Sequence, residues 1–247
     1  MSALFYKAIL LILIAFVPPL LYLRKVRNME KYAREPWSTL AKVFLWGAFI
    51  ATITAVILEI VLLAFAPHTL FRREYEYLAD EKSLEMLILA CVIAPFAEEF
   101  TKGVGVLTAK KCIKEVEDGL VYGAASGFGF AATENLLYEA SALQYGLITF
   151  IFVVFVRTIA SALLHGSATA MTGYGISRKI VLKRNYHVLP FYFAAVSMHA
   201  LFNLCASFSL LFDNAYLPLF GLLFAIGLAG TSYKFIKKKI ALLDARH

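Results

Sequence analysis

Residues 84–108 read LEMLILACVIAPFAEEFTKGVGVLT, and this stretch decides the fold. A helix of about 20 apolar residues crosses the roughly 30 Å of hydrocarbon in a bilayer. Glu98, Glu99 and Lys102 interrupt the apolar run. Because a charged side chain at the bilayer centre costs about 2.5–3.5 kcal/mol, such residues normally face the interior of a helix bundle and function there. The stretch therefore predicts a membrane helix with functional polar residues.

The whole chain has the composition of a membrane protein. Of its 247 residues, 61% are hydrophobic and 17% are charged, and the mean hydropathy is +0.73. Because a soluble domain carries about 25% charged residues, composition argues against a water-soluble enzyme. The formal net charge of +7 lies in short clusters between apolar runs, which is not the pattern of a nucleic-acid-binding face. We expect a lipid bilayer as the environment and no nucleic acid as a partner.

Seven apolar runs are long enough to cross a membrane as helices. They lie near residues 3–23, 41–66, 84–108, 119–138, 146–172, 188–212 and 216–236. The segments between them are too short for a folded soluble domain. The sequence therefore predicts an all-α, polytopic transmembrane bundle of about seven to eight helices with an intramembrane polar cavity. We expect residues 1–247 to form a single integral membrane domain.

Basic residues predict the orientation of these helices. Clusters of Lys and Arg lie in three connections and the C-terminal tail, at 24–34, 110–114, 178–184 and 234–246. The opposite connections carry little positive charge besides Arg72, Arg73 and Lys82, and acidic neighbours offset it. Because short basic loops stay in the cytoplasm, we expect an outside N-terminus and a cytoplasmic C-terminus.

Three further predicted helices carry polar side chains. These are Glu134 and Asn135 near 119–138, Arg157 and His165 near 146–172, and His199 and Asn203 near 188–212. A rise of about 1.5 Å per residue, counted from the cytoplasmic ends, gives two groups of depths. The group at roughly 10–17 Å contains Glu98, Glu99, His165 and His199, and the group at roughly 22–24 Å contains Glu134, Arg157 and Asn203. Four helices thus bring polar groups to overlapping depths, and we expect one shared cavity.

Small residues recur every fourth position along the helix near 119–138, at Gly119, Gly123, Gly127 and Ala131. A stripe of this kind permits another helix to approach closely. Glu134 continues the stripe, so we expect its carboxylate to point into protein rather than lipid.

These residue types suit hydrolysis by an activated water. Two adjacent carboxylates in a low dielectric do not both ionise easily, so Glu98 and Glu99 can supply a general base while Lys102 holds the other carboxylate ionised. A glutamate and a histidine can direct a water onto a peptide carbonyl. A second histidine and an asparagine can donate hydrogen bonds to the developing oxyanion. The pattern therefore favours an intramembrane protease of the glutamate type.

Three other designs of intramembrane protease lack their residues in this chain. The aspartyl type needs two aspartates in the membrane, whereas all four here fall in predicted loops or the tail, at Asp80, Asp118, Asp213 and Asp244. The site-2 metalloprotease motif His-Glu-x-x-His does not occur. The rhomboid motif Gly-x-Ser-Gly is matched only in part, by residues 124–127, which read AASG.

The polar residues, taken in order, resemble the PrsW family, a bacterial and archaeal branch of the intramembrane protease superfamily that also contains the CAAX prenyl endopeptidases and the APH-1 scaffold subunits. The similarity covers about the middle half of the chain. Its motifs are Glu98-Glu99-x-x-Lys102, Phe130-x-x-x-Glu134-Asn135, Arg157 with His165, and His199-x-x-x-Asn203. The resemblance implies a bundle of about eight helices with a cavity open to the cytoplasm of a prokaryotic cell. It also implies endopeptidase activity on a single-pass membrane protein, which in characterised members is an anti-sigma factor.

The resemblance also implies roles for individual residues. Glu98 would activate the water with help from His165, and Glu99 would position the helix or share the proton. His199 and Asn203 would form the oxyanion site. The supporting residues would be Lys102, Glu134, Asn135 and Arg157. Prenyl endopeptidases have Glu-Glu-x-x-x-Arg and Phe-x-x-x-His, so Lys102 and Glu134 disfavour prenylated substrates.

Metal dependence remains an alternative. We expect no metal or other cofactor, because the sequence contains no local ligand motif. Some members of the superfamily are nevertheless described as metal-dependent, and Glu134, His165 and His199 carry side chains that bind zinc.

Two other functional classes also remain open. Intramembrane Glu, His and Arg build proton relays in proton-coupled transporters, whose inverted repeats and broken helices are not evident here. A non-catalytic scaffold resembling APH-1 would keep the fold and lose the glutamates, whereas Glu98 and Glu99 are both present. The sequence leaves the oligomeric state open.

Overall fold

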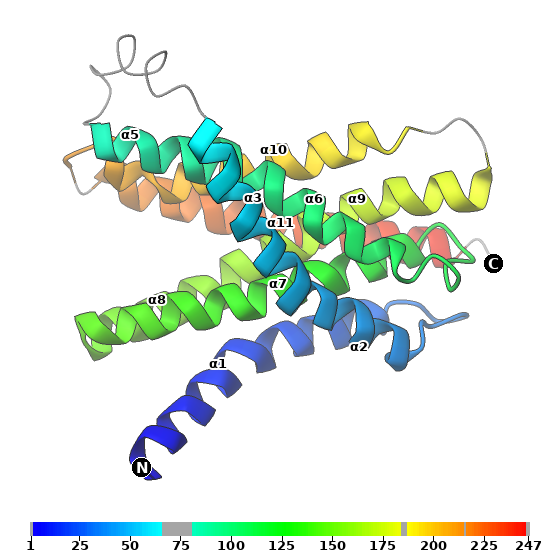
Figure 1. The fold of residues 1–247 in the computed structure, drawn as a ribbon. Helices are drawn as coiled ribbons and strands as arrows, with labels where there is room; N and C mark the ends of the chain where they lie inside the picture. Colours follow the sequence, from blue (N-terminus) through cyan, green and yellow to red (C-terminus); the bar gives the residue numbers. More distant parts are fainter. Residues whose placement is uncertain (1, 66–80, 184–186, 215, 246–247) are drawn as a thin grey trace.

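Helical rods build the whole of the computed structural model, which describes residues 2–65, 81–183, 187–214 and 216–245 (Figure 1). These ranges contain α-, π- and 3-10-helical turns and no strand, which confirms the all-α prediction. Arg72 and Arg73, named above for the outer connection, and Asp80, one of the four aspartates, lie outside the described residues.

The described ranges form seven rods that alternate in direction, several of them made of consecutive helical elements (Figure 1). In chain order the rods are α1 (Ser2–Arg27); α2, η1 and α3 (Trp37–Leu45, Trp46–Ala51 and Thr52–Phe65); α5, η2 and α6 (Glu81–Ile88, Leu89–Ile93 and Ala94–Leu107); α7 with η3 (Asp118–Ala142 and Leu143–Tyr145); α8, η4 and α9 (Leu147–Val156, Arg157–Ser161 and Ala162–Leu182); α10 with η5 (Leu189–Ala206 and Phe208–Leu210); and α11 (Tyr216–Asp244).

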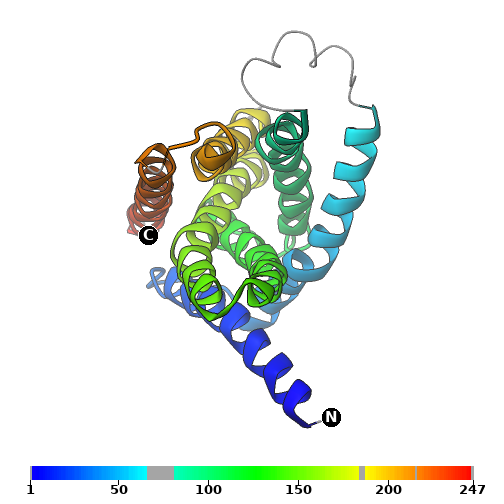
Figure 2. The same cartoon turned by 90° about the vertical axis from the view of Figure 1, so that its left-hand side faces the viewer.

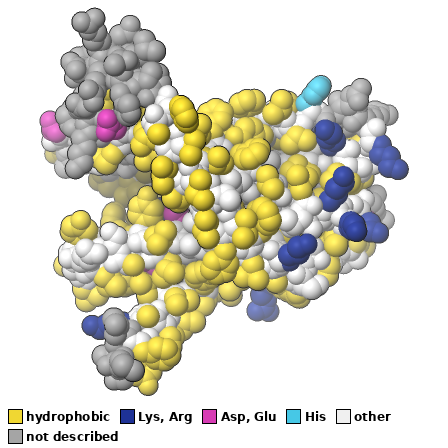
Figure 3. All heavy atoms as spheres, viewed as in Figure 1, with side chains coloured by type: hydrophobic (Ala, Val, Ile, Leu, Met, Phe, Trp, Pro, Cys, Tyr) yellow, Lys and Arg dark blue, Asp and Glu magenta, His cyan; other side chains and the backbone are white. Residues whose placement is uncertain are grey.

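Five of the rods contain helices long and apolar enough to cross a membrane by length and composition. They comprise Phe5–Arg27, Trp37–Phe65, Leu147–Leu182, Leu189–Ala206 and Tyr216–Asp244. Their outward faces carry large apolar side chains (Figure 3). On α3, for example, Ile53, Ile57 and Ile60 are each more than half exposed. Such faces are typical of helices that contact lipid.

The central element of the bundle is α7, which is buried along most of its length. The rods of α1, α2, α6 and α9 pack around it, as the end-on view in Figure 2 shows. Its sequence explains this position, because residues 119–132 are small, aliphatic or aromatic, with one serine and no charged group. A helix that is apolar on all sides is stable only when protein or lipid covers every side.

The close approach expected of the small-residue stripe is found between α7 and α9. A Cβ atom at Gly127 would overlap the carbonyl oxygen of His165, and one at Gly123 would overlap the carbonyl oxygen of Thr169. Any larger residue would force the two helices apart. The glycines therefore bring the backbone of α9 against α7, which allows His165 to reach Glu134.

The π-helical turn η4 sets the direction of two polar side chains on the rod from Leu147 to Leu182. It begins at Arg157 and ends four residues before His165. A π turn holds about one residue more than an α turn, so the eight residues from 157 to 165 complete about two turns. Arg157 and His165 consequently lie on the same face of the rod.

Lys and Arg side chains gather at the end of the bundle that contains the C-terminus (Figure 3). The turns at 28–36 and 108–117 lie at the same end, and α1 begins at the opposite end (Figure 1). We call this end the basic end. The clustering agrees with the charge pattern of the sequence.

Candidate active site

Three buried charges on α6 form the centre of the site. The ammonium of Lys102 lies 2.6 Å from Oε1 of Glu99 and 3.3 Å from Oε2 of Glu98. Helical spacing explains both contacts, because residues three and four apart share one face. Lys102 and Glu99 have no exposed surface, and the ammonium also rests on the ring of Phe130, 4.4 Å from its centroid. One buried cation thus compensates two buried carboxylates.

Glu99 is the anchor for α9 and α10. Its Oε2 accepts a hydrogen bond of 2.9 Å from the Thr169 hydroxyl, and its Oε1 lies 3.1 Å from Nδ1 of His199. Because the ionised carboxylate of Glu99 can only accept hydrogen bonds, Nδ1 of His199 carries the proton and donates it. This contact directs the other ring nitrogen, Nε2, away from Glu99.

His165 lies between Lys102 and Glu134. Its Nδ1 is 3.0 Å from the Lys102 ammonium, and its Nε2 is 2.7 Å from Oε2 of Glu134. An ammonium group only donates hydrogen bonds, so Nδ1 accepts and the ring proton sits on Nε2, where it is donated to Glu134. Both nitrogens of His165 are therefore engaged.

Arg157 lies on the side of the site that faces away from the basic end. One guanidinium nitrogen lies 2.7 Å from Oε2 of Glu134, and Nε donates a 3.0 Å hydrogen bond to Oδ1 of Asn135. Its guanidinium also stacks over Tyr138, 4.1 Å from the ring centroid. Glu134, Asn135 and Arg157 thus form a clamp that joins α7 to η4.

Glu98 faces both imidazoles without a direct hydrogen bond to either. Its Oε2 lies 3.8 Å from Nε2 of His199 and 3.8 Å from Nδ1 of His165. The two rings are edge to face, with centroids 4.7 Å apart. The two 3.8 Å distances from Glu98 to the imidazoles exceed the range of a direct hydrogen bond. A water can bridge polar atoms at such a distance. The carboxylate of Glu98 is the less enclosed of the pair, at 7% exposure against 0% for Glu99.

Asn203 lies apart from these contacts. Its amide nitrogen donates a 2.7 Å hydrogen bond to the carbonyl oxygen of Ala90 in η2. The hydrogen bond ties α10 to the rod that carries Glu98, and no recorded contact of the described residues joins Asn203 to either glutamate.

Two residues of the site were not singled out from the sequence. Thr169 binds Glu99, and the signal for it is its position one turn after His165. Glu59 on α3 interacts electrostatically with Glu134 and Lys102. The signal for Glu59 is a carboxylate inside the apolar run 41–66, the same feature that drew attention to Glu98.

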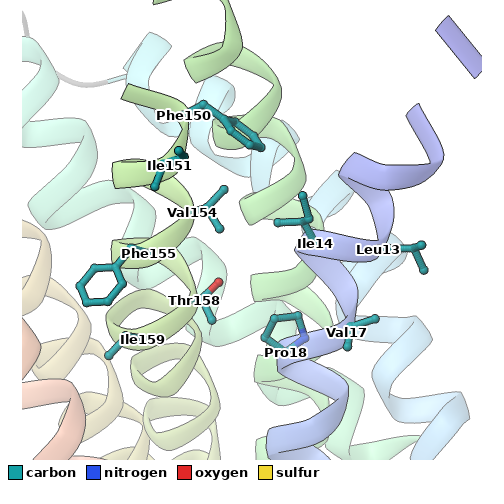
Figure 4. A pocket seen from close by; sticks show the side chains of 10 residues that line it. All are labelled: Leu13, Ile14, Val17, Pro18, Phe150, Ile151, Val154, Phe155, Thr158 and Ile159. Atoms are coloured by element: carbon teal, nitrogen blue, oxygen red, sulfur yellow. The ribbon is translucent and has the colours of Figure 1, made fainter. Parts of the chain in front are cut away.

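A groove between α6, α9 and α10 connects Glu99 with the basic end. It has a volume of about 680 Å³, apolar walls that include Val104 and Ile176, and two lysines, Lys110 and Lys179, toward the basic end. A second hollow, of about 740 Å³, lies between α1 and α8 (Figure 4). Its lining is apolar and carries no ionisable side chain, so it suits a lipid chain and not chemistry.

Comparison with known proteins identifies the family. The family described as PrsW family intramembrane metalloprotease matches residues 35–229 of the chain, which include all the polar residues of the site. The chain belongs to the PrsW family. With its helical rods and apolar faces, it is an integral membrane protein.

One curated relative is similar over much of the chain. Protease PrsW of Clostridioides difficile (strain 630) is 30% identical over 176 residues, which cover 68% of this chain and 65% of the relative. The match therefore spans slightly less than two thirds of that PrsW protein. No solved structure matches the chain.

The description of the PrsW family as metalloproteases makes the metal-binding capacity of the site important. Glu98, His165 and His199 each offer one ligand atom, and these atoms lie within 4.8 Å of one another. This set contains Glu98, whereas the sequence suggested Glu134 with the same two histidines. Imidazole and carboxylate are zinc ligands, so the donor types and spacing fit. The Lys102 ammonium contacts two of these ligands, and a zinc ion would have to displace it toward Glu99.

Proposed function

We propose that this PrsW-family protein is an intramembrane endopeptidase that hydrolyses a peptide bond in a membrane protein with a water activated by Glu98. The observation that carries the proposal is the 3.8 Å separation between Oε2 of Glu98 and Nε2 of His199 inside a bundle with apolar outer faces. A water shared by these two atoms would lie against a base and next to a second polar group.

In the proposed reaction, Glu98 takes a proton from the water while the water oxygen attacks the substrate carbonyl carbon. The proton then passes from Glu98 to the leaving amide nitrogen, and the carbon–nitrogen bond breaks. Proton transfer by a positioned side chain contributes about 10²–10⁴-fold to such a rate. Glu98 finishes the cycle in its original ionised form.

We propose His199, rather than His165, as the histidine that works with Glu98. The sequence favoured His165, but Lys102 and Glu134 engage both of its ring nitrogens. In His199, only Nδ1 is engaged, by Glu99, and Nε2 faces Glu98. Glu99 therefore acts as a positioning residue that fixes the ring of His199.

The substrate class follows from the groove that ends at Glu99. Its apolar walls suit a segment of a single-pass membrane protein, and Lys110 and Lys179 suit acidic residues that follow this segment. Because clustered basic residues stay in the cytoplasm, the basic end is the cytoplasmic end in this proposal. The N-terminus then lies outside the cell and the C-terminus in the cytoplasm.

A metal-dependent reaction is the second candidate, and the mutual spacing of Glu98, His165 and His199 favours it. These three residues would hold a zinc ion, which lowers the pKa of bound water to about 7 in catalytic sites. Glu134 and Glu99 would then orient the two imidazoles through their other ring nitrogens, as outer partners of metal ligands do.

The test is reconstitution of the purified protein in liposomes with a single-pass anti-sigma factor as the probe substrate. We expect the wild-type protein to produce a cleaved fragment and both Glu98→Gln and His199→Ala to lose at least about 100-fold in rate. Glu85→Gln, an exposed position on the same rod, is the matched control and should retain activity. Equal cleavage by wild type and Glu98→Gln would refute the proposal.

Two additional arms separate the alternatives. Treatment with a chelator, followed by measurement of bound zinc and of cleavage, separates the two mechanisms. Retention of full activity without zinc supports activation by Glu98 alone, and loss restored by zinc supports the metal-dependent reaction. Proton flux across the liposome membrane without any cleavage would instead favour a transporter. Absence of both proton flux and cleavage, with the protein and the substrate still bound in an intact complex, would favour a scaffold.

A further inference from the structure

A second group of buried carboxylates lies at the basic end, away from the candidate active site. Glu30 and Glu35 belong to the turn between α1 and α2, and Asp118 is the first residue of α7. All three are buried, with exposures of 1%, 3% and 4%. One oxygen atom from each lies within 4.8 Å of the other two. Two separate parts of the chain thus bring three acidic groups to one point.

Two carboxylate oxygens in this group accept no hydrogen bond. These are Oε1 of Glu30 and Oε2 of Glu35, both shielded from solvent. Buried polar atoms are normally paired, so an unpaired carboxylate oxygen needs an explanation such as an ion or a water. The second oxygen of Glu30 accepts a long hydrogen bond of 3.5 Å from the backbone of Glu35. The other contacts of Glu30 and Glu35 are with carboxyl groups of the same cluster.

The recorded hydrogen bonds of Arg27 and Arg34 go to backbone carbonyls and not to these carboxylates. Nε of Arg27 donates to the backbone carbonyl of Glu35 at 2.6 Å, and Nε of Arg34 donates to the backbone carbonyl of Glu30 at 2.7 Å. Asp118 uses Oδ2 to accept hydrogen bonds from the backbone of Lys114 and Glu115. These contacts fix the chain around the three carboxylates and leave their charges without a recorded partner cation among the described residues.

Burial without a cation is unfavourable for such a group. Loss of solvent on burial raises the pKa of Glu30 and of Glu35 above the ordinary carboxyl range. A divalent cation removes this cost, because it compensates the negative charges while it coordinates the oxygens.

We propose that Glu30, Glu35 and Asp118 bind one hard divalent cation of the Mg²⁺ type at the basic end. Carboxylate oxygen is the ligand that Mg²⁺ and similar cations prefer. Mg²⁺ usually keeps several waters among its ligands. A cavity of about 360 Å³ adjoins the group and provides space for them; Glu35 and Asp118 line it together with the basic residues Arg34, Lys111 and Lys114. The cation would join the α1–α2 turn to the start of α7.

The proposed site is structural and is independent of the catalytic proposal. The same turn is also held from the other side, because the backbone of Lys31 donates hydrogen bonds to Asp244 at the end of α11. A cation would therefore complete a junction of α1, α2, α7 and α11. It would fix the start of the helix that carries Glu134.

The first test measures binding of Mn²⁺, a paramagnetic probe for a Mg²⁺ site, by electron paramagnetic resonance on the full chain in lipid nanodiscs. The background is Glu98→Gln with His199→Ala, so that the intramembrane ligand set does not contribute. We expect one bound Mn²⁺ in this background, displaced by excess Mg²⁺. Glu30→Gln with Glu35→Gln should weaken Mn²⁺ binding by at least about 10-fold, because two of three charged ligands are lost.

Asp213→Asn is the matched control, since Asp213 is an exposed aspartate outside the group, and it should leave Mn²⁺ binding unchanged. Absence of Mn²⁺ binding in the background, or equal binding in the double Gln variant, would overturn the proposal.

The second test does not depend on variants that remove two buried charges. Asp118→Asn keeps a side-chain oxygen that can accept the hydrogen bonds from Lys114 and Glu115. We expect added Mg²⁺ to raise the melting temperature of the background protein and to have no effect on Asp118→Asn. An equal rise in both proteins would show that Mg²⁺ acts elsewhere and would also overturn the proposal.

Discussion

Nζ of Lys102 lies 2.6 Å from Oε1 of Glu99, and neither side chain has any exposed surface. The same ammonium contacts Glu98 and His165. Lys102 is thus the cation around which three ionisable groups from α6 and α9 are arranged. A lysine that only anchored the end of a helix in the headgroup region would extend toward solvent, and this one does not.

Lys102→Met should strongly destabilise the protein. The substitution keeps most of the side-chain volume but leaves Glu98 and Glu99 without their buried cation. Removal of one partner of a buried ion pair costs about 3–5 kcal/mol, which lowers the melting temperature by on the order of 10 °C in a chain of this size. Thermal unfolding in detergent measures the effect. Lys114→Met, at an exposed position, is the control, and an equal small change in both variants would contradict the central role of Lys102.

Glu134 and Arg157 should show energetic coupling. Their 2.7 Å ion pair is mostly shielded, with side-chain exposures of 18% and 14%. Groups in direct contact in one network couple by about 0.5–3 kcal/mol. Unfolding free energies of Glu134→Gln, Arg157→Gln and the double variant give this coupling energy. Strictly additive effects would mean that the pair does not stabilise the junction of α7 and η4.

The identity of the polar cluster followed from the sequence because ionisable residues are expensive in an apolar helix. Glu98, Lys102 and Glu134 stand out from their neighbours for this reason alone. The structure brings them together with His165 and His199 as expected. The PrsW resemblance, drawn from the same residues, is confirmed by the family match. Catalytic roles were not accessible in this way and remain proposals.

The predicted depths grouped His165 with Glu98 and His199, and the three side chains do lie together. The end of the helix that carries His165 was less predictable, because its apolar run ends near residue 172. The helix continues to Leu182, because Arg178 and Lys179 extend an amphipathic end beyond the apolar run. Apolarity marks where a helix meets hydrocarbon, whereas a helix itself ends only where its hydrogen bonding ends.

The contacts of single side chains also depended on features without a sequence signal. The amide of Asn203 binds a carbonyl in η2, and no rule of spacing predicts that a π turn will offer one there. Periodicity arguments assume regular α-helix, so π turns are where they fail.

Gly127→Ala should destabilise the bundle, although alanine is the better helix former. The added Cβ would overlap the carbonyl of His165 on α9, so the helices must separate, and overpacking of this kind typically costs about 1–3 kcal/mol. Gly227→Ala is the matched control, because nothing lies within 4 Å of a Cβ at that helical position. There we expect a gain of about 0.5–1 kcal/mol. Opposite signs in the two unfolding measurements support the close contact, and a gain in both would exclude it.

Asn203→Ala and His199→Ala should separate stability from catalysis. Asn203 ties α10 to the carbonyl of Ala90, so its loss should lower stability by about 0.5–1.5 kcal/mol and change kcat of cleavage by less than about threefold. His199 faces Glu98, so its loss should lower kcat at least about 100-fold. Both variants are measured for melting temperature and for turnover of the reconstituted substrate. A loss of turnover in Asn203→Ala as large as that in His199→Ala would restore the oxyanion role that the sequence suggested, because a side chain that only ties two helices together does not act on the chemical step.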